Sequence, residues 1–177
     1  MRIIVTGGSG FIGSHLVDDL IEKNYEVIVI DLITNHSDTR YLNPNVKHYF
    51  ADISNPTILK KIIEKDDYII HLAAQSHVDI SFKEPNYTIM NNVLSTQNIM
   101  QASFENKAAK ILIMSTDEVY GSHDVISDVN SLDPSSPYSA SKAASDMIVN
   151  SYKHMYPEMQ INTLRSKIGR ASCRERV

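Results

Sequence analysis

Short apolar runs alternate with amphipathic stretches along most of the chain. The runs are rich in Val and Ile and are bounded by Gly, Asn, Asp or Pro, which is the pattern of buried strands. The predicted strands cover residues 2–6, 26–30, 46–50, 68–72, 111–115 and 161–165. Between them, apolar residues recur at helical spacing, and the predicted helices cover residues 11–23, 56–64, 86–106 and 138–155. Asn55-Pro56 and Ser136-Pro137 each place an N-cap residue before a first-turn Pro, which marks where two of these helices begin.

The regular alternation of strands and helices indicates one α/β domain over residues 1–166. Parallel strands joined by helices use right-handed crossovers, which place helices on both faces of the sheet. We therefore predict a Rossmann-type, doubly wound parallel sheet with the strand order 3-2-1-4-5-6. Residues 121–136 are polar, and we expect them to form a loop that is the most mobile part of this domain.

A glycine-rich loop connects the first predicted strand to the first predicted helix, with the sequence Gly7-Gly8-Ser9-Gly10-Phe11-Ile12-Gly13. The first two glycines permit a tight turn, Gly10 lets the backbone approach a pyrophosphate, and Gly13 permits close packing of helix on strand. The start of the helix, at Phe11 and Ile12, offers N–H groups and a positive dipole to phosphates. An ordinary turn would also use glycine, but the strand–loop–helix context favours a dinucleotide site.

Asp31 ends the second predicted strand, about 20 residues after this loop, where an acid accepts hydrogen bonds from the adenosine ribose hydroxyls. A carboxylate at this position repels a 2′-phosphate, so the sequence predicts NAD in preference to NADP. Loop, context and acid agree, and together they favour the cofactor interpretation over an ordinary turn.

Three further segments are candidates for cofactor contacts at the strand ends. Asp52-Ile53 follows the third strand and can touch the adenine, although a loop Asp that caps the next helix explains it equally well. Leu72-Ala73-Ala74 follows the fourth strand, where small residues let the backbone lie against the cofactor. Ser115 ends the fifth strand at the same edge of the sheet.

Tyr138 and Lys142 lie four residues apart on one predicted helix and therefore on one face of it. A neighbouring ammonium stabilises a phenolate and lowers the pKa of the tyrosine. Tyr138 then becomes a usable base for a sugar hydroxyl near neutral pH, and Lys142 can also reach the nicotinamide ribose. The spacing alone is more typical of a surface pair, but it favours catalysis when it follows a dinucleotide loop.

Thr116, Asp117 and Glu118 follow the fifth strand directly, at the carboxyl edge of the sheet. Thr116 can bond a hydroxyl that is being oxidised. Adjacent carboxylates are usually a solvated loop feature, but elimination of water needs one acid and one base, and two carboxyls in unlike environments can divide these roles. Two other polar residues are weaker candidates. His77 alone is more typical of a structural residue, whereas Asn92 is expected to bond the fourth-strand loop or to lie near the catalytic residues.

Composition and charge exclude several other classes of function. The 177-residue chain has a net charge of −4, which gives no indication of binding to nucleic acid or to an anionic membrane. Its single cysteine excludes an internal disulfide framework. We see no run long enough to span a bilayer and no signal-peptide pattern at the start, so we expect a cytoplasmic protein without a metal site.

The last residues break the pattern of everything before them. Residues 168–177 read IGRASCRERV, a basic string that matches the translation of a common sequencing-library adapter. We therefore interpret residues 167–177 as read-through into adapter and leave them, with Cys173, out of the fold prediction. A genuine basic tail is the alternative, and native DNA that continues through codon 168 to the same residues would establish it.

Four stretches of this chain resemble the extended short-chain dehydrogenase/reductase family and, within it, the dTDP-glucose 4,6-dehydratases. They are IIVTGGSGFIGSHLV (3–17), HLAAQSHVDISF (71–82), STDEVYG (115–121) and PSSPYSASKAASD (134–146). The glycine loop is common to the whole family, whereas the Thr-Asp-Glu run combined with YSASK is much more specific. Sister epimerases usually lack the Asp-Glu pair.

The resemblance implies a reaction in which NAD is recycled within each turnover. Tyr138 would deprotonate the glucose C4 hydroxyl, helped by Thr116 and Lys142, and NAD would take the hydride. Glu118 would remove the C5 proton while Asp117 protonates the departing C6 hydroxyl, and the hydride would return to C6. The product would be a 4-keto-6-deoxy sugar nucleotide, and a homodimer through two long helices would be the expected assembly.

Three departures from the family pattern leave the substrate open. Gln75 stands where these dehydratases often have Glu, and GDP-mannose 4,6-dehydratases often have Gln there. Ser95 replaces a common Gly. Arg165-Ser166 should lead into an Asn-x-Tyr-Gly-Pro stretch and a substrate domain, so we expect the fold to be truncated before that domain. A UDP- or GDP-sugar dehydratase, a sister epimerase or decarboxylase, and a non-catalytic NAD-binding regulator remain alternatives.

Overall fold

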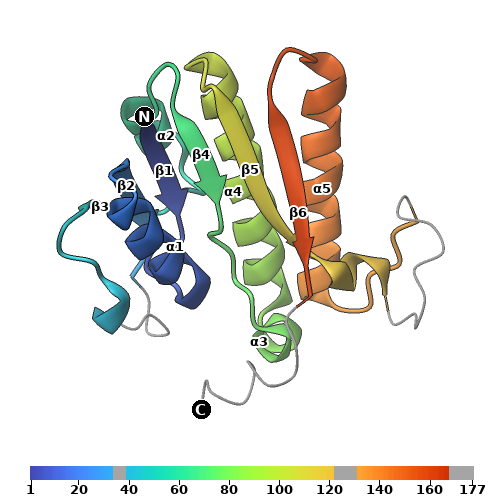
Figure 1. Cartoon of the computed structure of the whole chain (residues 1–177). Coiled ribbons are helices and arrows are strands. Elements are labelled where there is room, and N and C mark those ends of the chain that lie inside the picture. The colour runs from blue at the N-terminus through green and yellow to red at the C-terminus, as the bar shows by residue number, and fades with distance from the viewer. Residues whose placement is uncertain (34–38, 122–130, 168–177) are drawn as a thin grey trace.

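The computed structural model describes residues 1–33, 39–121 and 131–167. These residues form one six-stranded parallel sheet in the order β3-β2-β1-β4-β5-β6, flanked by helices on both faces (Figure 1). This arrangement confirms the predicted doubly wound sheet and its strand order. Residues 122–130, within the predicted mobile loop, and residues 168–177, the predicted adapter sequence, lie outside the described residues.

The elements follow one another with short connections. In chain order they are β1 (Arg2–Thr6), α1 (Phe11–Glu22), β2 (Glu26–Asp31), η1 (Thr39–Tyr41), β3 (Lys47–Phe50), α2 (Pro56–Ile62), β4 (Tyr68–His71), α3 (Val78–Lys83), α4 (Pro85–Glu105), β5 (Lys110–Thr116), η2 (Asp117–Tyr120), α5 (Pro137–Met155) and β6 (Ile161–Ser166). All six predicted strands and four predicted helices are present, and in all but one of them the ends differ by at most one residue. The exception is helix 56–64, which ends at Ile62.

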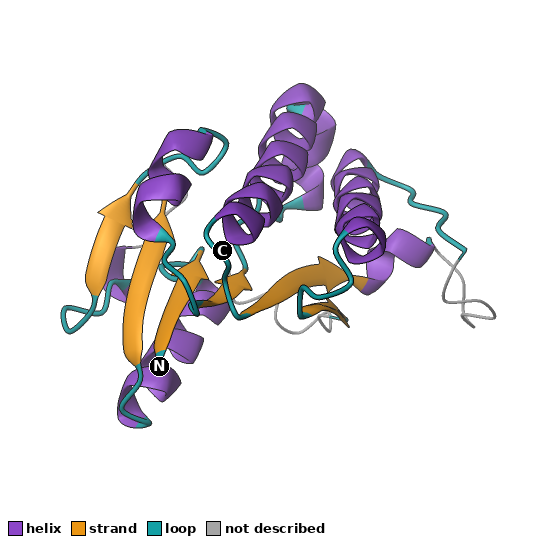
Figure 2. Cartoon of the chain, turned by 90° about the horizontal axis from the view of Figure 1, so that it is seen from above, coloured by secondary structure: helices purple, strands orange, loops and turns teal. Residues whose placement is uncertain are grey.

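The alternating side chains of β1 and β2 point into two separate cores. On one face, Ile4 and Ile28 pack with side chains from α2, α4 and α5, including Ile99 and Val149. On the other face, Val5 packs with β2 and with α1. Figure 2 shows the helices arranged on either side of the sheet in this way. The middle positions of the central strands are therefore apolar on both faces, as expected for a parallel sheet covered on both sides.

The two cores differ in how far they extend across the sheet. Within the described residues, α1 alone covers the second face, so this face is bare over β5 and β6. Leu112 and Met114 are half-buried there, and Leu164 is 48% exposed. Strand β6 is also an edge strand, which leaves one row of backbone groups unpaired within the described sheet.

Helix ends are set by the residues that the sequence identified. The Asn55 side chain accepts a bond from Thr57 N at 3.1 Å and caps α2. At α5, Ser136 and Ser139 form a reciprocal capping box, which fixes the start of the helix that carries Tyr138 and Lys142. Within residues 1–33, 39–121 and 131–167, no helix combines the length and apolar character that crossing a membrane requires.

Candidate active site

The candidate functional residues lie at one edge of the sheet, where the central strands have their carboxyl ends. The glycine loop follows β1, the Leu72–Ala74 segment follows β4, and the Thr116–Glu118 segment follows β5. Strands β1, β4 and β5 are neighbours in the sheet, so these three segments lie next to one another (Figure 1). Ligands of open α/β sheets bind at this edge.

Two glycines of the loop are required by close backbone contacts. Gly7 has a φ of 72°, and a Cβ on it would lie 2.7 Å from Ala73 N. A Cβ on Gly13 would collide with the Gly7 carbonyl oxygen, so helix α1 can approach the loop only with glycine there. Gly10 differs, because its nearest neighbour would be Gly7 O at 3.3 Å and the residue is otherwise exposed. The loop therefore presents open backbone at Gly10, directly before α1.

Asp31 holds the loop in place from the end of β2. One carboxylate oxygen accepts a bond from Ser9 N at 2.8 Å and the other accepts one from Leu32 N at 2.8 Å. Burial raises the pKa of Asp31, and the two backbone bonds oppose that rise. The carboxylate thus lies at the carboxyl end of β2 beside the glycine loop, and its bond to a ribose stays a prediction.

Asp52 and Ile53 have structural partners in this fold. The Asp52 side chain accepts a bond from Ser54 N at 2.8 Å within the loop, whereas the residue that caps α2 is Asn55 and not Asp52. Ile53 is buried in the larger core, and its carbonyl accepts a bond from Asn98 at 3.0 Å. A contact between this segment and adenine stays a prediction.

The segment after β4 is fixed to the two long helices by Asn92. Its Oδ1 accepts a bond from Gln75 N at 2.8 Å, and its Nδ2 donates to Gln75 O and to Ser141 Oγ. Asn92 therefore bonds the loop after β4, which is the first of the two roles predicted for it from the sequence. Ser141 lies next to Lys142 on α5, so the loop and the helix with the Tyr-Lys pair share one connection.

Lys142 is almost completely buried at the base of the site. Its ammonium donates to the carbonyl of Met114, in β5, at 2.6 Å. Burial lowers the pKa of Lys142 to about 8, and the nearby charge of Asp146 opposes that shift. Tyr138 lies half-buried in the first turn of the same helix, one turn before Lys142. The lysine keeps its charge below about pH 8, which is the form that can stabilise a phenolate.

The two carboxylates are carried by η2, a single 3₁₀ turn that the sequence did not predict. Thr116 caps this turn, since its hydroxyl accepts a bond from Glu118 N at 3.3 Å. Burial, and then the charge of Asp117, raise the pKa of Glu118. Val119 and Tyr120 of the turn are buried against Ala143 of α5, the residue after Lys142. The carboxylate turn and the Tyr-Lys helix are thus packed directly on each other.

Ser115 supplies one observation on whether a ligand fits at this edge. Among the described residues, its buried hydroxyl has no hydrogen-bond partner. Buried polar groups are normally bonded, so an orphan hydroxyl beside Thr116 indicates a partner that the protein alone does not supply. Together with the open backbone at Gly10 and the carboxylate of Asp31, it fits a dinucleotide that extends along the carboxyl edge from β2 to β5.

His71, at the end of β4, is a buried polar residue that the sequence analysis missed. Its Nδ1 lies 2.7 Å from Thr6 Oγ1, and its Nε2 lies 3.4 Å from Thr96 Oγ1. Burial, and then the charge of Lys142, lower the pKa of His71 to about 3, so the ring is neutral. The only signal in the sequence was a polar residue at the end of an apolar run, and its partners are distant along the chain.

A sequence profile of the family described as GDP-mannose 4,6 dehydratase matches residues 4–169. That match covers most of the chain. The chain belongs to the GDP-mannose 4,6 dehydratase family. This membership agrees with the resemblance seen in the sequence motifs.

Relatives within and around this family are named for two reactions. A probable dTDP-glucose 4,6-dehydratase of Sinorhizobium fredii is 40% identical over 88% of this chain and 50% of its own length. The solved dTDP-glucose 4,6-dehydratase of Streptomyces venezuelae, with NAD bound, is 37% identical, with a TM-score of 0.84 over 92% of this chain and 55% of its own. A UDP-glucose 4-epimerase of Thermotoga maritima is 33% identical, with a TM-score of 0.84 over 93% of this chain and 55% of its own.

These matches also define how much of a relative the chain represents. The chain spans about half the length of the curated relatives it matches. Members of the family whose structures are solved include proteins with NAD bound, in agreement with the cofactor predicted from the glycine loop and Asp31.

Proposed function

We propose that this chain is the NAD-binding part of a nucleotide-sugar 4,6-dehydratase, with dTDP-glucose as the preferred substrate and a 4-keto-6-deoxy sugar nucleotide and water as products. The observation that carries the proposal is the packing of the Asp117–Tyr120 turn on α5 beside Lys142. This packing supports the proposal that an oxidation site and an acid–base pair serve one substrate position. NAD, when bound, would accept the hydride in the first step and return it in the last.

Tyr138, Lys142 and Thr116 serve the oxidation at C4. Lys142 is charged below about pH 8 and is anchored to Met114 O, so its position on α5 is fixed relative to β5. Its charge favours the phenolate of Tyr138, which takes the proton from the C4 hydroxyl. Thr116 bonds the same hydroxyl from the end of β5.

Asp117 and Glu118 serve the elimination of water. The raised pKa of Glu118 makes its carboxylate a stronger base toward the C5 proton. Asp117 gives a proton to the C6 hydroxyl as it leaves. Two adjacent carboxyls on one short turn can divide these roles because their surroundings differ.

A UDP-glucose 4-epimerase is the second candidate, because structural neighbours with that name match this chain as well as the dehydratase does. An epimerase has no water to eliminate and no need for an acid–base pair at C5 and C6. The adjacent Asp117 and Glu118 therefore favour the dehydratase. The alternatives for the nucleotide are dTDP, UDP and GDP. Gln75 is compatible with GDP, because GDP-mannose 4,6-dehydratases often have Gln at this position.

The expected assembly is a homodimer through α4 and α5. Their outer surfaces expose apolar side chains, among them Ile89 (41%), Met90 (57%) and Met147 (60%). Exposed apolar side chains that gather on two adjacent helices indicate a surface that another copy covers. Sedimentation of the full-length gene product would test this expectation, and a monomer at micromolar concentration would contradict it.

The decisive experiment measures oxidation and water loss separately in the full-length gene product. A nucleotide-glucose is supplied, and the 4-keto-6-deoxy product is detected by its enol absorbance in alkali. Asp117→Asn should retain C4 oxidation and lose water elimination by roughly 100-fold or more. Asp19→Asn, an exposed change on α1, serves as the control. Absence of the signal with every nucleotide-glucose would defeat the dehydratase proposal, and equal loss of both steps would contradict the role of Asp117.

A further inference from the structure

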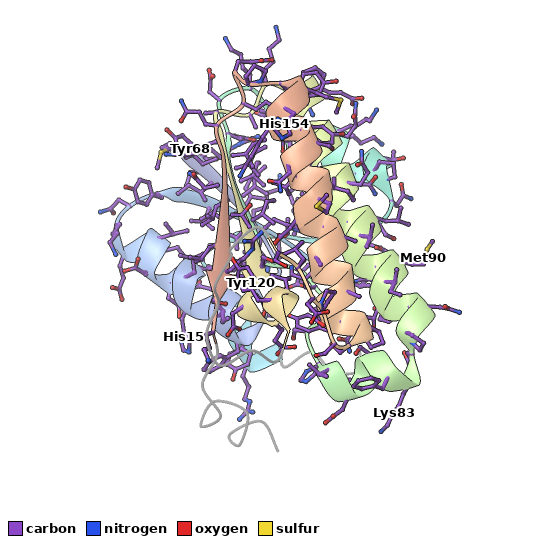
Figure 3. The ribbon with its side chains drawn as sticks, turned by 90° about the vertical axis from the view of Figure 1, so that its right-hand side faces the viewer. His15, Tyr68, Lys83, Met90, Tyr120 and His154 are labelled. Atoms are coloured by element: carbon purple, nitrogen blue, oxygen red, sulfur yellow. The ribbon has the colours of Figure 1, made fainter. Side chains whose placement is uncertain are left out.

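A cluster of three side chains, two of them buried and one half-buried, joins the carboxylate turn to the rest of the domain. Arg165 of β6 donates through Nε to Asp146 Oδ2 at 2.8 Å, and through Nη1 to the hydroxyl of Tyr120. Asp146 lies on α5, one turn after Lys142, and Tyr120 ends the η2 turn. Figure 3 labels Tyr120 in this turn, beside the lower part of α5. The guanidinium thus bridges η2, α5 and β6.

The cluster depends on Arg165. Asp146 is 2% exposed, and among the described residues its second carboxylate oxygen has no partner. Tyr120 is also buried, at 8% exposure. Burial works against the charge of Arg165, but its bonds to Asp146 and Tyr120 outweigh burial and raise its pKa. Removal of the guanidinium would leave a buried carboxylate without its counter-ion, which is strongly unfavourable.

Apart from the packing of Val119 and an exposed ion pair between Lys167 and Asp117 at 4.0 Å, the other contacts of the turn are made by its backbone. Thr116 caps its start, and Val119 O accepts a bond from Asp133 N at 3.0 Å. Gly121 has a φ of 78° and lies against the Asp133 carbonyl, where a Cβ would not fit. These contacts fix where the turn begins and ends. The lateral position of the turn against α5 rests on the packing of Val119 and on the Tyr120–Arg165–Asp146 cluster.

We propose that Arg165 is a positioning residue, which holds the Asp117–Tyr120 turn against helix α5 through its bonds to Tyr120 and Asp146. Arg165 lies opposite Ser115 near the carboxyl end of β6, and its side chain bonds Tyr120 and Asp146. Its fork geometry lets one side chain bond a phenol and a carboxylate at fixed directions, which a lysine cannot do. The turn carries Asp117 and Glu118, so the guanidinium sets where the two carboxylates lie relative to Tyr138 and Lys142. The meaning of this placement for catalysis rests on the proposed function, whereas the mechanical role does not.

Asp146 also connects the cluster to the oxidation site. Its charge raises the pKa of Lys142 against the effect of burial, so the same carboxylate that anchors Arg165 helps to keep the lysine protonated. Tyr120 and Arg165 therefore fix the elimination pair, and Asp146 supports the base of the oxidation pair. The carboxylate of Asp146 is thus shared by the cluster that holds the η2 turn and by Lys142, on the same helix.

Hydrogen exchange of the turn amides tests the mechanical role in the 177-residue chain without substrate. The reporters are Gly121 N, which bonds Glu118 O, and Glu118 N, which bonds Thr116. In Arg165→Met, their exchange should rise by about tenfold, because the turn then opens locally. The matched control is Arg2→Met, which removes a guanidinium from an equally buried aspartate, Asp67, at the opposite end of the sheet. Unchanged exchange in Arg165→Met, or an equal rise in both variants, would overturn the proposal.

Two milder variants keep the test decisive if Arg165→Met does not fold. Tyr120→Phe removes one bond and keeps the ion pair, so turn exchange should rise about threefold. Arg165→Lys keeps the charge and loses the fork, and it should fall between the wild type and Arg165→Met. Turn exchange in Tyr120→Phe equal to that of the wild type would contradict the proposal.

Turnover of the full-length gene product tests what the positioning does. Arg165→Met should slow water elimination by roughly 10- to 100-fold while KM and C4 oxidation change little, since displaced groups lose rate without losing binding. Arg165→Lys should restore part of the rate. Equal loss of oxidation and elimination would show that Arg165 has only a structural role. An absence of turnover in the wild type would count against the proposed function and leave the exchange result in force.

Discussion

The two ends of the sheet differ in how completely their buried charged and polar groups are hydrogen-bonded. At the amino end, Arg2 bonds both oxygens of the buried Asp67 at 2.8 Å and also pairs with Glu64. A further bond, from Glu64 N to Asp67 at 2.7 Å, completes the surroundings of that carboxylate. At the carboxyl end, the Ser115 hydroxyl and one oxygen of Asp146 have no partner among the described residues, and Glu118 has a raised pKa.

This difference separates stability from chemistry within one domain. Burying the Arg2–Asp67 pair costs little free energy, because every desolvated atom of the pair has a partner. The pair also fixes β1 relative to β4. Unpaired polar atoms and shifted pKa values are unfavourable in the folded state and are typical of sites that a ligand completes. The amino end therefore stabilises the fold, and the carboxyl end carries the unpaired polar atoms that the proposed cofactor and sugar would meet.

The largest effect that would sharpen this contrast is on turnover at the carboxyl end. Tyr138→Phe removes the proposed base, so kcat of the full-length gene product should fall roughly 1000-fold while the free energy of unfolding changes by less than about 1 kcal/mol. Tyr152→Phe is the matched control on the same helix, where the hydroxyl bonds Gln97 and Gln101. A Tyr138 variant that retains most of its rate would remove the assignment.

The complementary change at the amino end should affect stability alone. Asp67→Asn replaces a nearly buried charge that faces Arg2, and breaking such a pair costs about 3 kcal/mol in the free energy of unfolding. Urea denaturation of the chain measures this loss. The affinity for NAD should stay within about threefold of the wild type, because Asp67 lies at the far end of the strands. A large loss of NAD affinity in the folded variant would break the division of roles.

The sequence predicted the framework well because its signals are local. Apolar runs gave the strands, and Asn55 and Ser136 marked two helix starts through bonds to residues two and three positions away. Helix α3 was missed because it is six residues long, its N-cap residue His77 makes no side-chain capping bond, and it ends at Lys83, shortly before Pro85. Turn η2 was missed because one capping bond from Thr116 to Glu118 decides it.

The site was predicted in part, for the same reason. The glycine loop, Asp31 and the Tyr138–Lys142 spacing are local patterns, and the structure brings their elements to one edge. The partners of His71 lie 65 and 25 residues away, and Arg165 meets Asp146 across 19 residues. Such pairs depend on strand register and helix packing, which a single sequence without an alignment does not display.

The free energy of unfolding should fall in acid because of the buried His71 at the carboxyl end of β4. The folded pKa of His71 is about 3 and lies below the usual 6.5, so the unfolded chain takes up the proton first as the pH falls. The folded state then loses stability from about pH 6.5 downward, by about 2 kcal/mol between pH 7 and pH 5 from this residue. Urea midpoints of His71→Asn should show a correspondingly flatter pH dependence. The exposed His15→Asn is the control, and identical pH slopes in all three proteins would contradict the assignment.

The smallest effect concerns Asp31, the charge that is predicted to select the cofactor. Asp31→Asn keeps a side-chain oxygen for Ser9 N or Leu32 N but loses the negative charge beside the expected ribose. Hydrogen bonds to a charged acceptor are stronger than those to a neutral one, so NAD affinity should fall about tenfold. NADP should bind no worse than before, because its 2′-phosphate no longer meets a carboxylate. Calorimetric titration of the chain with both cofactors measures the ratio. An unchanged ratio of the two affinities would mean that Asp31 only holds the glycine loop. The part of the carboxyl edge that binds the cofactor would then begin at β1 and not at β2.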